Sequence, residues 1–175
     1  IRERSDGEHW KRAHPEIDPR FLFVSAGYNV RPTEMTGAMG LCQVPRLQGF
    51  VDERRENHRR WCEAIDALEL PLRVFPELDG TTHAGFAFPI LLQPSSGHDR
   101  AAVCAKLESR GISTRPISGS NLARQPAFTH LEFARVEGET PVADAVHERG
   151  FFVGQSHAFD DEHMDRLLEG LKSAF

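Results

Sequence analysis

The sequence predicts an α+β fold, in which a long helix and shorter helices cover a small, mainly antiparallel sheet of three or four strands. Two observations lead to this prediction. Before Pro71 the apolar residues recur at helical spacing, whereas after it short extended runs alternate with helical segments. The 175 residues, 39% hydrophobic and 27% charged, have the composition of a globular domain. A chain of this size can bury a core without disulfides or a structural metal.

The first segment, residues 1–20, is polar and charged and contains Pro15 and Pro19. Prolines and charges at this density predict a loop or frayed lead-in rather than an element of the core. The chain also begins with Ile1 rather than Met. We therefore expect a polar lead-in belonging to a processed or shortened piece of a longer protein.

Residues 21–70 are predicted to form a helical segment that links to another domain. A first helix is expected from Thr33, because a threonine can cap the helix start and Glu34 lies in the positive first turn. Pro45 is expected to end or kink this helix. A second, longer helix is predicted from about Leu47 to Leu68, with one apolar side and a charged opposite face.

Residues 71–175 are predicted to form a small α+β domain. Gly111 should end one of its helices as a left-handed cap, and residues 116–139 form a long connection of the kind that often carries binding groups. The predicted strands are Leu72–Phe75, Gly85–Leu92, Ile112–Arg115 and Phe151–Val153, and the predicted helices are Asp99–Arg110, Val142–Glu148 and Asp160–Ala174.

Charge and composition exclude several classes of function. The net charge of −5 argues against a nucleic-acid partner, since such domains usually carry a basic face. No stretch approaches the roughly 20 apolar residues that span a bilayer, so we expect no membrane partner and a cytoplasmic location. The three cysteines have the pattern of structural thiols. The nine histidines show no metal-ligand spacing, and we expect no metal.

Three segments carry polar groups suited to binding. Asn29 and Arg31 lie in a turn before a helix start, where they could meet a phosphate; the alternative is a plain capped turn. Arg115, Asn121 and Gln125 follow a strand end, and their planar donors suit sugar hydroxyls or diphosphate oxygens. For this segment a solvated loop is an equally good interpretation. The histidines of the third group, at strand ends, are more often structural than catalytic; they are His83 and His157.

Two of these segments resemble a known family. Residues 27–41, GYNVRPTEMTGAMGL, are similar to the GYN-x-R-x-T-[DE]-x-x-[AG]-A-x-G-L signature of the DegT/DnrJ/StrS sugar aminotransferases. Residues 111–115 and 119–126, GISTR and GSNLARQP, resemble the TR…GN-L-x-R-Q-P segment of the RfbH-like nucleotide-sugar 3-dehydratases. The resemblance extends from about Phe21 to the end of the chain.

The resemblance implies the fold of type I aminotransferases, of which this chain would be the small carboxy-terminal domain. Pyridoxal or pyridoxamine phosphate would be bound in the large domain, near a catalytic lysine or histidine upstream of residue 1, and we expect none bound to this chain alone. In a homodimer Asn29, with Tyr28 and Arg31, would contact the cofactor. The nucleotide-sugar would be contacted by the residues Arg115, Asn121, Gln125 and His83.

The same resemblance implies an activity for the full-length protein. We expect a 3-dehydratase acting on a nucleotide-linked 4-keto-6-deoxyhexose in lipopolysaccharide O-antigen or deoxysugar biosynthesis, with an iron–sulfur flavoprotein reductase as its partner. A sugar aminotransferase of the same family is one alternative, and a non-catalytic dimerisation or binding module is another. The isolated chain is expected to be inactive.

Overall fold

The computed structural model describes residues 7–13, 15, 32–117, 120–125 and 136–175. The chain divides into two units, Ile1–Val44 and Pro45–Phe175. In the first unit, the loop predicted for residues 1–20 is wrong for Gly7–Ala13, which forms the short helix α1. Its ends carry the charges that a helix dipole favours, and Lys11 Nζ lies 2.6 Å from Glu8 Oε1.

The helix predicted from Thr33 is confirmed as α2, Glu34–Gln43. Thr33 Oγ1 accepts the backbone N–H of Thr36 at 3.3 Å, which is the hydrogen bond of an N-cap. A short 3₁₀ turn, η2, follows at Val44–Arg46, where Pro45 interrupts the helix as expected. The apolar side chains of α2 are exposed rather than buried, with Met35 at 79% and Met39 at 68%.

The second unit begins with the long helix α3, Leu47–Asp66, which ends two residues before the predicted Leu68. The chain reverses there through Glu69, whose φ of 53° lies in the left-handed region. The buried stripe of α3 comprises Asn57, His58, Trp61, Cys62 and Ile65. The apolar side predicted for this helix is therefore confirmed at Trp61 and Ile65, but its polar members were not predicted.

Four strands form one antiparallel sheet in the order β1-β2-β4-β3. They are β1 Leu72–Arg73, β2 Ala87–Leu92, β3 Thr114–Pro116 and β4 Gly150–Gly154. In β2 buried residues alternate with half-buried ones, and in β4 Phe152 is half-buried between the buried Phe151 and Val153. The sheet therefore has one buried face and one more open face.

The remaining elements are the helices α4 Arg100–Ser109, α6 Pro141–Arg149 and α7 Asp161–Ala174 and the 3₁₀ turns η3 Pro94–Ser96 and η4 Leu122–Arg124. Gly111, with φ of 77°, ends α4 as predicted. The N–H groups of Gly111 and Ile112 donate to the carbonyls of Glu108 and Leu107 at 2.9 and 3.1 Å. This pattern is a Schellman motif, and it explains why β3 starts after Ile112 rather than at it.

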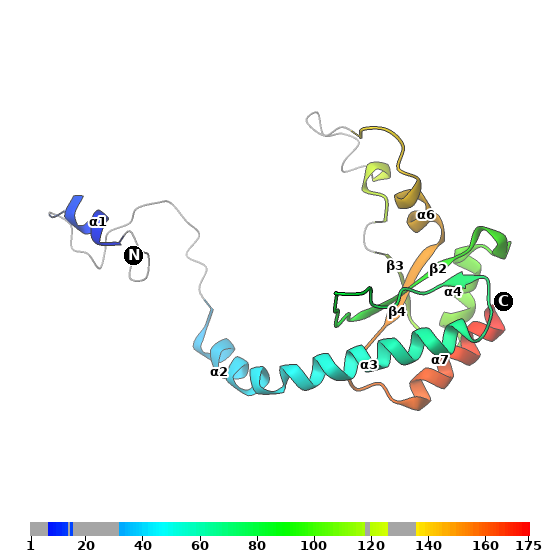
Figure 1. Cartoon of the computed structure of the whole chain (residues 1–175), viewed down its shortest axis with the longest axis horizontal. Helices are drawn as coiled ribbons and strands as arrows, with labels where there is room; N and C mark the ends of the chain where they lie inside the picture. The colour runs from blue at the N-terminus through cyan, green and yellow to red at the C-terminus, as the bar shows by residue number, and fades with distance from the viewer. Residues whose placement is uncertain (1–6, 14, 16–31, 118–119, 126–135) are drawn as a thin grey trace. The chain divides into compact units, whose positions relative to one another are not determined.

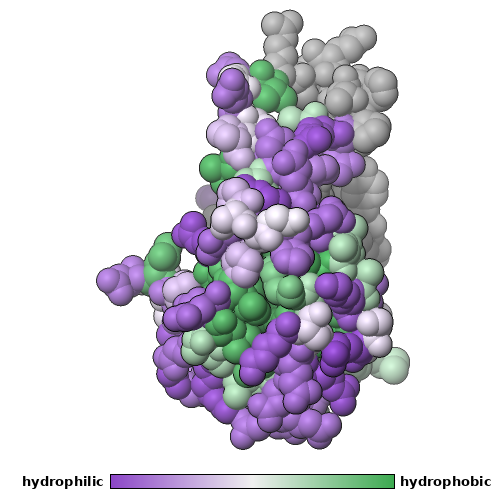
Figure 2. All heavy atoms as spheres, turned by 90° about the vertical axis from the view of Figure 1, so that its right-hand side faces the viewer, coloured by the Kyte–Doolittle hydropathy of each residue, from purple (hydrophilic) through white to green (hydrophobic). Residues whose placement is uncertain are grey.

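The core of the second unit lies between the sheet and three helices. Figure 1 shows α3 and α7 lying side by side along the sheet. The fully buried members of the core include Phe88 and Ile90 from β2, Phe151 from β4, Leu107 from α4 and Leu171 from α7. The predicted α+β architecture is confirmed. On the face drawn in Figure 2, apolar side chains gather in a patch near the middle, and further apolar side chains lie among polar ones elsewhere.

Candidate functional site

The predicted substrate residue Arg115 lies in the middle of β3, at the edge of the sheet. In register it stands opposite Phe152 of β4, whose other neighbour is Pro89 of β2. These three residues therefore share a row on the open face of the sheet. Arg115 is exposed, and the structure gives its guanidinium no partner among the described residues. Its five donors are thus available to an anionic or hydroxyl-rich ligand.

Asn121 is placed differently from Arg115, because it is only 3% exposed. Its Nδ2 donates to Thr140 Oγ1 at 2.9 Å and to Asp144 Oδ1 at 2.8 Å, and its Oδ1 accepts the N–H of Ala123 at 3.0 Å. The amide thus holds the start of η4 against α6. No hydrogen atom of this amide is left to donate to a substrate.

Gln125 ends the η4 turn, and its backbone N–H donates to the carbonyl of Leu122 at 3.0 Å. Its side chain is half-buried. The next residues, from 126 to 135, lie outside the described part of the chain. Gln125 therefore stays a prediction as a substrate contact.

His83 is bound to the long helix rather than to the η4 segment. Its Nδ1 accepts the N–H of Gly85 at 3.1 Å, which leaves the ring proton on Nε2. That Nε2 lies 3.2 Å from His58 Nε2. The two rings pack edge to face, with their centroids 4.2 Å apart. Burial, followed by the neighbouring His58, lowers the pKa of His83.

The sequence did not single out His58, the partner of His83. Its ring is 2% exposed, and its Nε2 also lies 2.8 Å from the Phe75 carbonyl and 3.6 Å from Cys62 Sγ. The only available signal was the four-residue spacing of His58 and Cys62 on the buried stripe of α3. The described residues contain no group of three or more ligands arranged for a metal ion.

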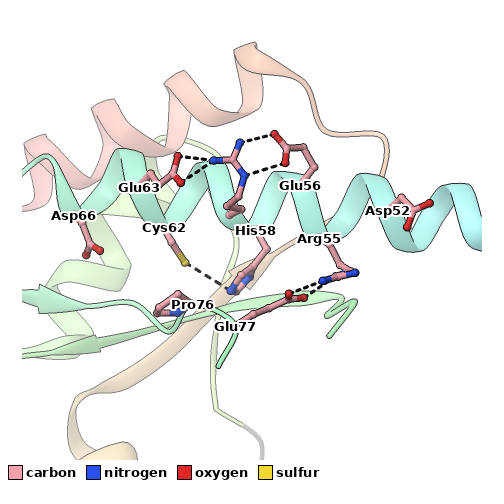
Figure 3. Close-up of a pocket in the computed structure, with 10 residues that line it drawn as sticks. Asp52, Arg55, Glu56, His58, Cys62, Glu63, Asp66, Pro76 and Glu77 are labelled. Carbon is pink, nitrogen blue, oxygen red and sulfur yellow. Dashed lines mark hydrogen bonds and ion pairs between the residues drawn. The ribbon is translucent and has the colours of Figure 1, made fainter. Parts of the chain in front are cut away.

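A cavity of about 510 Å³, lined in part by His58, lies between α3 and the segment before β2 (Figure 3). Its charged walls are largely paired. Arg55 donates to both oxygens of Glu77 at 2.8 and 2.7 Å, and these hydrogen bonds hold the pKa of Glu77 at about 2. Arg59 binds Glu56 and Glu63 in the same way along the helix. The ion pair between Arg55 and Glu77 therefore joins α3 to the segment before β2, and few charged groups of the cavity remain unpaired.

The predicted substrate residues do not converge on one point. His83 precedes β2, whose first residue, Ala87, pairs with Gly154 at the end of β4. The η4 segment follows β3, whose last residue, Pro116, pairs with Phe151 near the start of β4. His83 and Asn121 therefore lie toward opposite ends of β4. The other lone histidine considered, His157, packs against Phe50 with ring centroids 4.1 Å apart.

The three predicted cofactor contacts, Tyr28, Asn29 and Arg31, lie outside the described residues. Elsewhere, Lys106 Nζ donates to the carbonyl of Ala174 at 2.9 Å, and Lys11 is paired with Glu8. Neither amine lies in a cavity. The cofactor contacts therefore stay predictions.

Comparison with known proteins identifies the family. The model of the DegT/DnrJ/EryC1/StrS aminotransferase family matches residues 3–172. The chain belongs to this family. The resemblance noted at residues 27–41 is thereby confirmed, and the branch indicated by residues 111–126 is confirmed by the relatives described next.

The curated relatives of this family member include three enzymes or pathway proteins of deoxysugar metabolism. The dTDP-4-dehydro-2,6-dideoxy-D-glucose 3-dehydratase of Saccharopolyspora spinosa is 32% identical over 90% of this chain and 34% of its own length. The GDP-4-keto-6-deoxy-D-mannose 3-dehydratase of Yersinia pseudotuberculosis is 32% identical over 93% of this chain and 44% of its own length. The lipopolysaccharide biosynthesis protein RfbH of Salmonella typhimurium is 28% identical over 90% of this chain and 36% of its own length. The chain thus spans less than half the length of each.

Solved structures agree with this assignment. A GDP-4-keto-6-deoxymannose-3-dehydratase variant with bound GDP-perosamine has a TM-score of 0.75 and 31% identity, over 86% of this chain and 38% of that one. The same type of enzyme with a trapped PLP-glutamate geminal diamine has a TM-score of 0.77 and 28% identity, over 93% of this chain and 44% of that one. The predicted fold of a type I aminotransferase small domain is therefore confirmed. Among the described residues, no helix is both long and apolar enough to cross a bilayer.

Proposed function

We propose that this chain is the small-domain part of a pyridoxal or pyridoxamine phosphate-dependent enzyme that removes the 3-hydroxyl of a nucleotide-linked 4-keto-6-deoxy sugar. The observation that supports the proposal best is the identity of 28–32% to four proteins of 3-dehydratase or RfbH type, each over at least 90% of this chain. Since the chain covers less than half of each, the activity belongs to a larger protein that also supplies the large domain.

The proposal assigns the substrate contact and the cofactor contacts to different segments of the chain. Arg115 lies exposed on the sheet edge with its guanidinium unpaired among the described residues, which suits the diphosphate or a vicinal diol of the sugar nucleotide. Asn29, at the start of the helical segment, would contact the cofactor phosphate, and Tyr28 and Arg31 would support it. The cofactor supplies the electron sink for the elimination, and the upstream histidine or lysine supplies the base.

The test is an assay of the longest reading frame that carries this chain. The purified protein would be incubated with GDP- and dTDP-linked 4-keto-6-deoxyhexoses, with pyridoxamine phosphate and a one-electron reductant. A product lacking one oxygen at C3, identified by mass spectrometry and NMR, is expected. Failure to bind or convert any nucleotide-sugar would contradict the proposal and favour a non-catalytic dimerisation or binding module.

The alternative reaction is transamination of the keto sugar with glutamate as the amino donor. It is favoured by a second group of relatives, GDP-perosamine synthases of Vibrio cholerae and Escherichia coli O157:H7, which are 22% and 21% identical. The same assay separates the two reactions when pyridoxal phosphate and glutamate are supplied. A product that gains nitrogen and keeps its 3-hydroxyl would identify an aminotransferase.

The proposal also includes partners and location. A homodimer is expected, because Asn29 would complete the cofactor site of the second subunit. If the reaction is a 3-dehydration, the proposal further includes an iron–sulfur flavoprotein reductase in the cytoplasm as a partner that supplies electrons. Sedimentation of the full-length protein, alone and with such a reductase, tests both associations.

A further inference from the structure

The segment that follows β3 is fastened to α6 through one carboxylate, that of Asp144. Asn121 Nδ2 donates to Asp144 Oδ1 at 2.8 Å, and Thr140 Oγ1 donates to Asp144 Oδ2 at 3.3 Å. The same Nδ2 also donates to Thr140 Oγ1 at 2.9 Å, which closes a three-residue ring of hydrogen bonds. Both oxygens of the carboxylate are therefore in use within this ring.

A second contact strengthens the attachment. Arg124, at the end of η4, donates through one Nη atom to Glu148 Oε1 at 3.0 Å and to Asp144 Oδ1 at 3.4 Å. Asp144 and Glu148 are four residues apart on α6, so they present their carboxylates on one helix face. The hydrogen bond from Asn121 is the main cause that lowers the pKa of Asp144, so this group is ionised at neutral pH.

The position of Asp144 relates it to Arg115. Helix α6 continues without a linker into β4 at Gly150, and β4 pairs with the β3 residue Arg115 through Phe152. One continuous α6–β4 element thus contacts Arg115, through the pairing of β3 with β4, and also Asn121 and Arg124 of the η4 turn. The junction is tight, because a Cβ added to Gly150 would lie 2.6 Å from the Val146 carbonyl and 3.0 Å from Ile117 Cδ1. The start of β4 therefore packs closely against both α6 and the residue that follows β3.

From this arrangement we infer that Asp144 is a positioning residue for the nucleotide-sugar segment, and that Asn121 acts through it rather than touching the ligand. The inference rests on the proposed function for the identity of the ligand. Asn121 is buried and its N–H groups are used, whereas Arg115 on the same segment is exposed and unpaired among the described residues. The direct polar contact is assigned to Arg115, and its placement to Asp144.

An exchange of the two side chains tests the inference. Asn121→Asp places a second carboxylate against Asp144, whereas the double variant Asn121→Asp/Asp144→Asn restores one donor and one acceptor with the roles reversed. Asp at position 121 keeps an oxygen for the Ala123 N–H. In the full-length protein we expect the single variant to raise KM for the nucleotide-sugar about tenfold, and the double variant to recover most of that loss. The cofactor spectrum and kcat should stay near wild type.

The matched control is Asp165→Asn, which removes an exposed carboxylate on α7. Amide hydrogen exchange at residues 123–125 provides a readout that does not depend on activity. Faster exchange in Asn121→Asp that is reversed in the double variant, together with the KM changes, supports the inference. Unchanged exchange would show that the attachment to α6 is not formed through Asp144 and would overturn it.

The remaining outcomes are also decisive. Amide exchange at residues 123–125 could be faster in Asn121→Asp and return to normal in the double variant while KM stays at the wild-type value in every variant. Asp144 is then merely structural, and the positioning role is rejected. If the wild-type protein binds no nucleotide-sugar, the proposed function fails and the ligand-positioning role fails with it, whereas the exchange pattern still establishes the attachment of η4 to α6. Failure of the function and failure of the attachment are thus separate results.

Discussion

At the scale of single residues, Arg115 in β3 and Asn121 in the segment after it are two polar groups with different surroundings. Arg115 extends from the open face of the sheet, and its guanidinium has no partner in the described part of the chain. Asn121, six residues later, is buried and bound to Thr140 and Asp144. Residue type alone favoured both as ligand contacts, because both carry planar donors. Burial and bonding separate them.

Arg115→Lys in the full-length protein should raise KM for the nucleotide-sugar about tenfold, because lysine cannot reproduce the two parallel hydrogen bonds of a guanidinium. The cofactor spectrum and the melting temperature should not change. The matched control is Arg110→Lys, at an exposed position after α4. Loss of stability with a normal KM would show instead that Arg115 serves the fold.

A second prediction concerns pH and the contact between His83 and His58. The pKa of His83 is lowered by burial and then by His58, so the unfolded chain binds this proton more readily than the folded one. The corresponding stability is present above the ordinary pKa of 6.5 and is lost as the pH falls below it. His83→Asn keeps an acceptor for the Gly85 N–H and should flatten the pH dependence of the melting temperature between pH 7 and 5.

The pH range in which His83 affects stability is separate from that of Glu77. The pKa of Glu77 is lowered to about 2, so its contribution to stability is lost only when the pH falls below the ordinary value of 4.5. Glu77 is unsuitable as a control, because its carboxylate accepts the backbone N–H of His83 and raises the pKa of His83. The control is Glu56→Gln, which removes a carboxyl whose pKa is lowered by the hydrogen bond from Arg59 and should leave the slope between pH 7 and 5 as it is. A slope that is the same in wild type and His83→Asn would contradict the assignment.

At the scale of elements, local chemistry predicted the starts and ends well. Thr33, Asp99 and Asp160 all accept a backbone N–H at a helix start, and Gly111 adopts the left-handed conformation at a helix end. The short α1 helix was missed because its support comes from side-chain pairs rather than an apolar stripe. What the sequence could not predict are contacts between distant elements, such as the one from His58 to a histidine 25 residues away.

The candidate site shows the same limit. The binding segment could be located because polar residues follow a strand end, but the partner of Asn121 is 23 residues away on α6. Neither periodicity nor spacing relates two positions across such a connection. The surroundings of individual residues depend on that tertiary contact, so the buried state of Asn121 became visible only in the structure.

The junction of α6 and β4 provides an element-scale prediction. In Gly150→Ala the added methyl would clash with the Val146 carbonyl, a backbone atom that cannot rotate away, and we expect a loss of about 1–3 kcal/mol in the free energy of unfolding. Gly154→Ala at the other end of the same strand meets no atom within 4 Å and should change stability by less than about 0.5 kcal/mol. Urea denaturation of both variants measures the difference, and equal losses would contradict the steric account.

At the scale of the whole molecule, the hydrophobic core belongs to the second unit. Every member of the buried cluster lies between Trp61 and Ala174. The first unit contributes α1 and α2, and the large apolar side chains of α2 are exposed. The second unit therefore has its own hydrophobic core, as expected of an independently folding domain.

Removal of residues 1–44 should leave the cooperative unfolding transition of the chain nearly unchanged. We expect the melting temperature of residues 45–175 to lie within about 3 °C of that of the whole chain, since none of the described residues before Pro45 belongs to the buried cluster. Differential scanning calorimetry of the two chains measures this difference. A broad or absent transition in the shorter chain would show that residues 1–44 stabilise the core.

The strand order has a consequence for how copies of this protein can meet. The two edges of the sheet are β1, which is two residues long and follows Pro71, and β3, whose last residue is Pro116 and therefore lacks an N–H. Short edges interrupted by proline are poor templates for β-augmentation by a strand from another chain. Any association through this unit must then rely on side chains, and the sheet itself is protected from edge-to-edge aggregation.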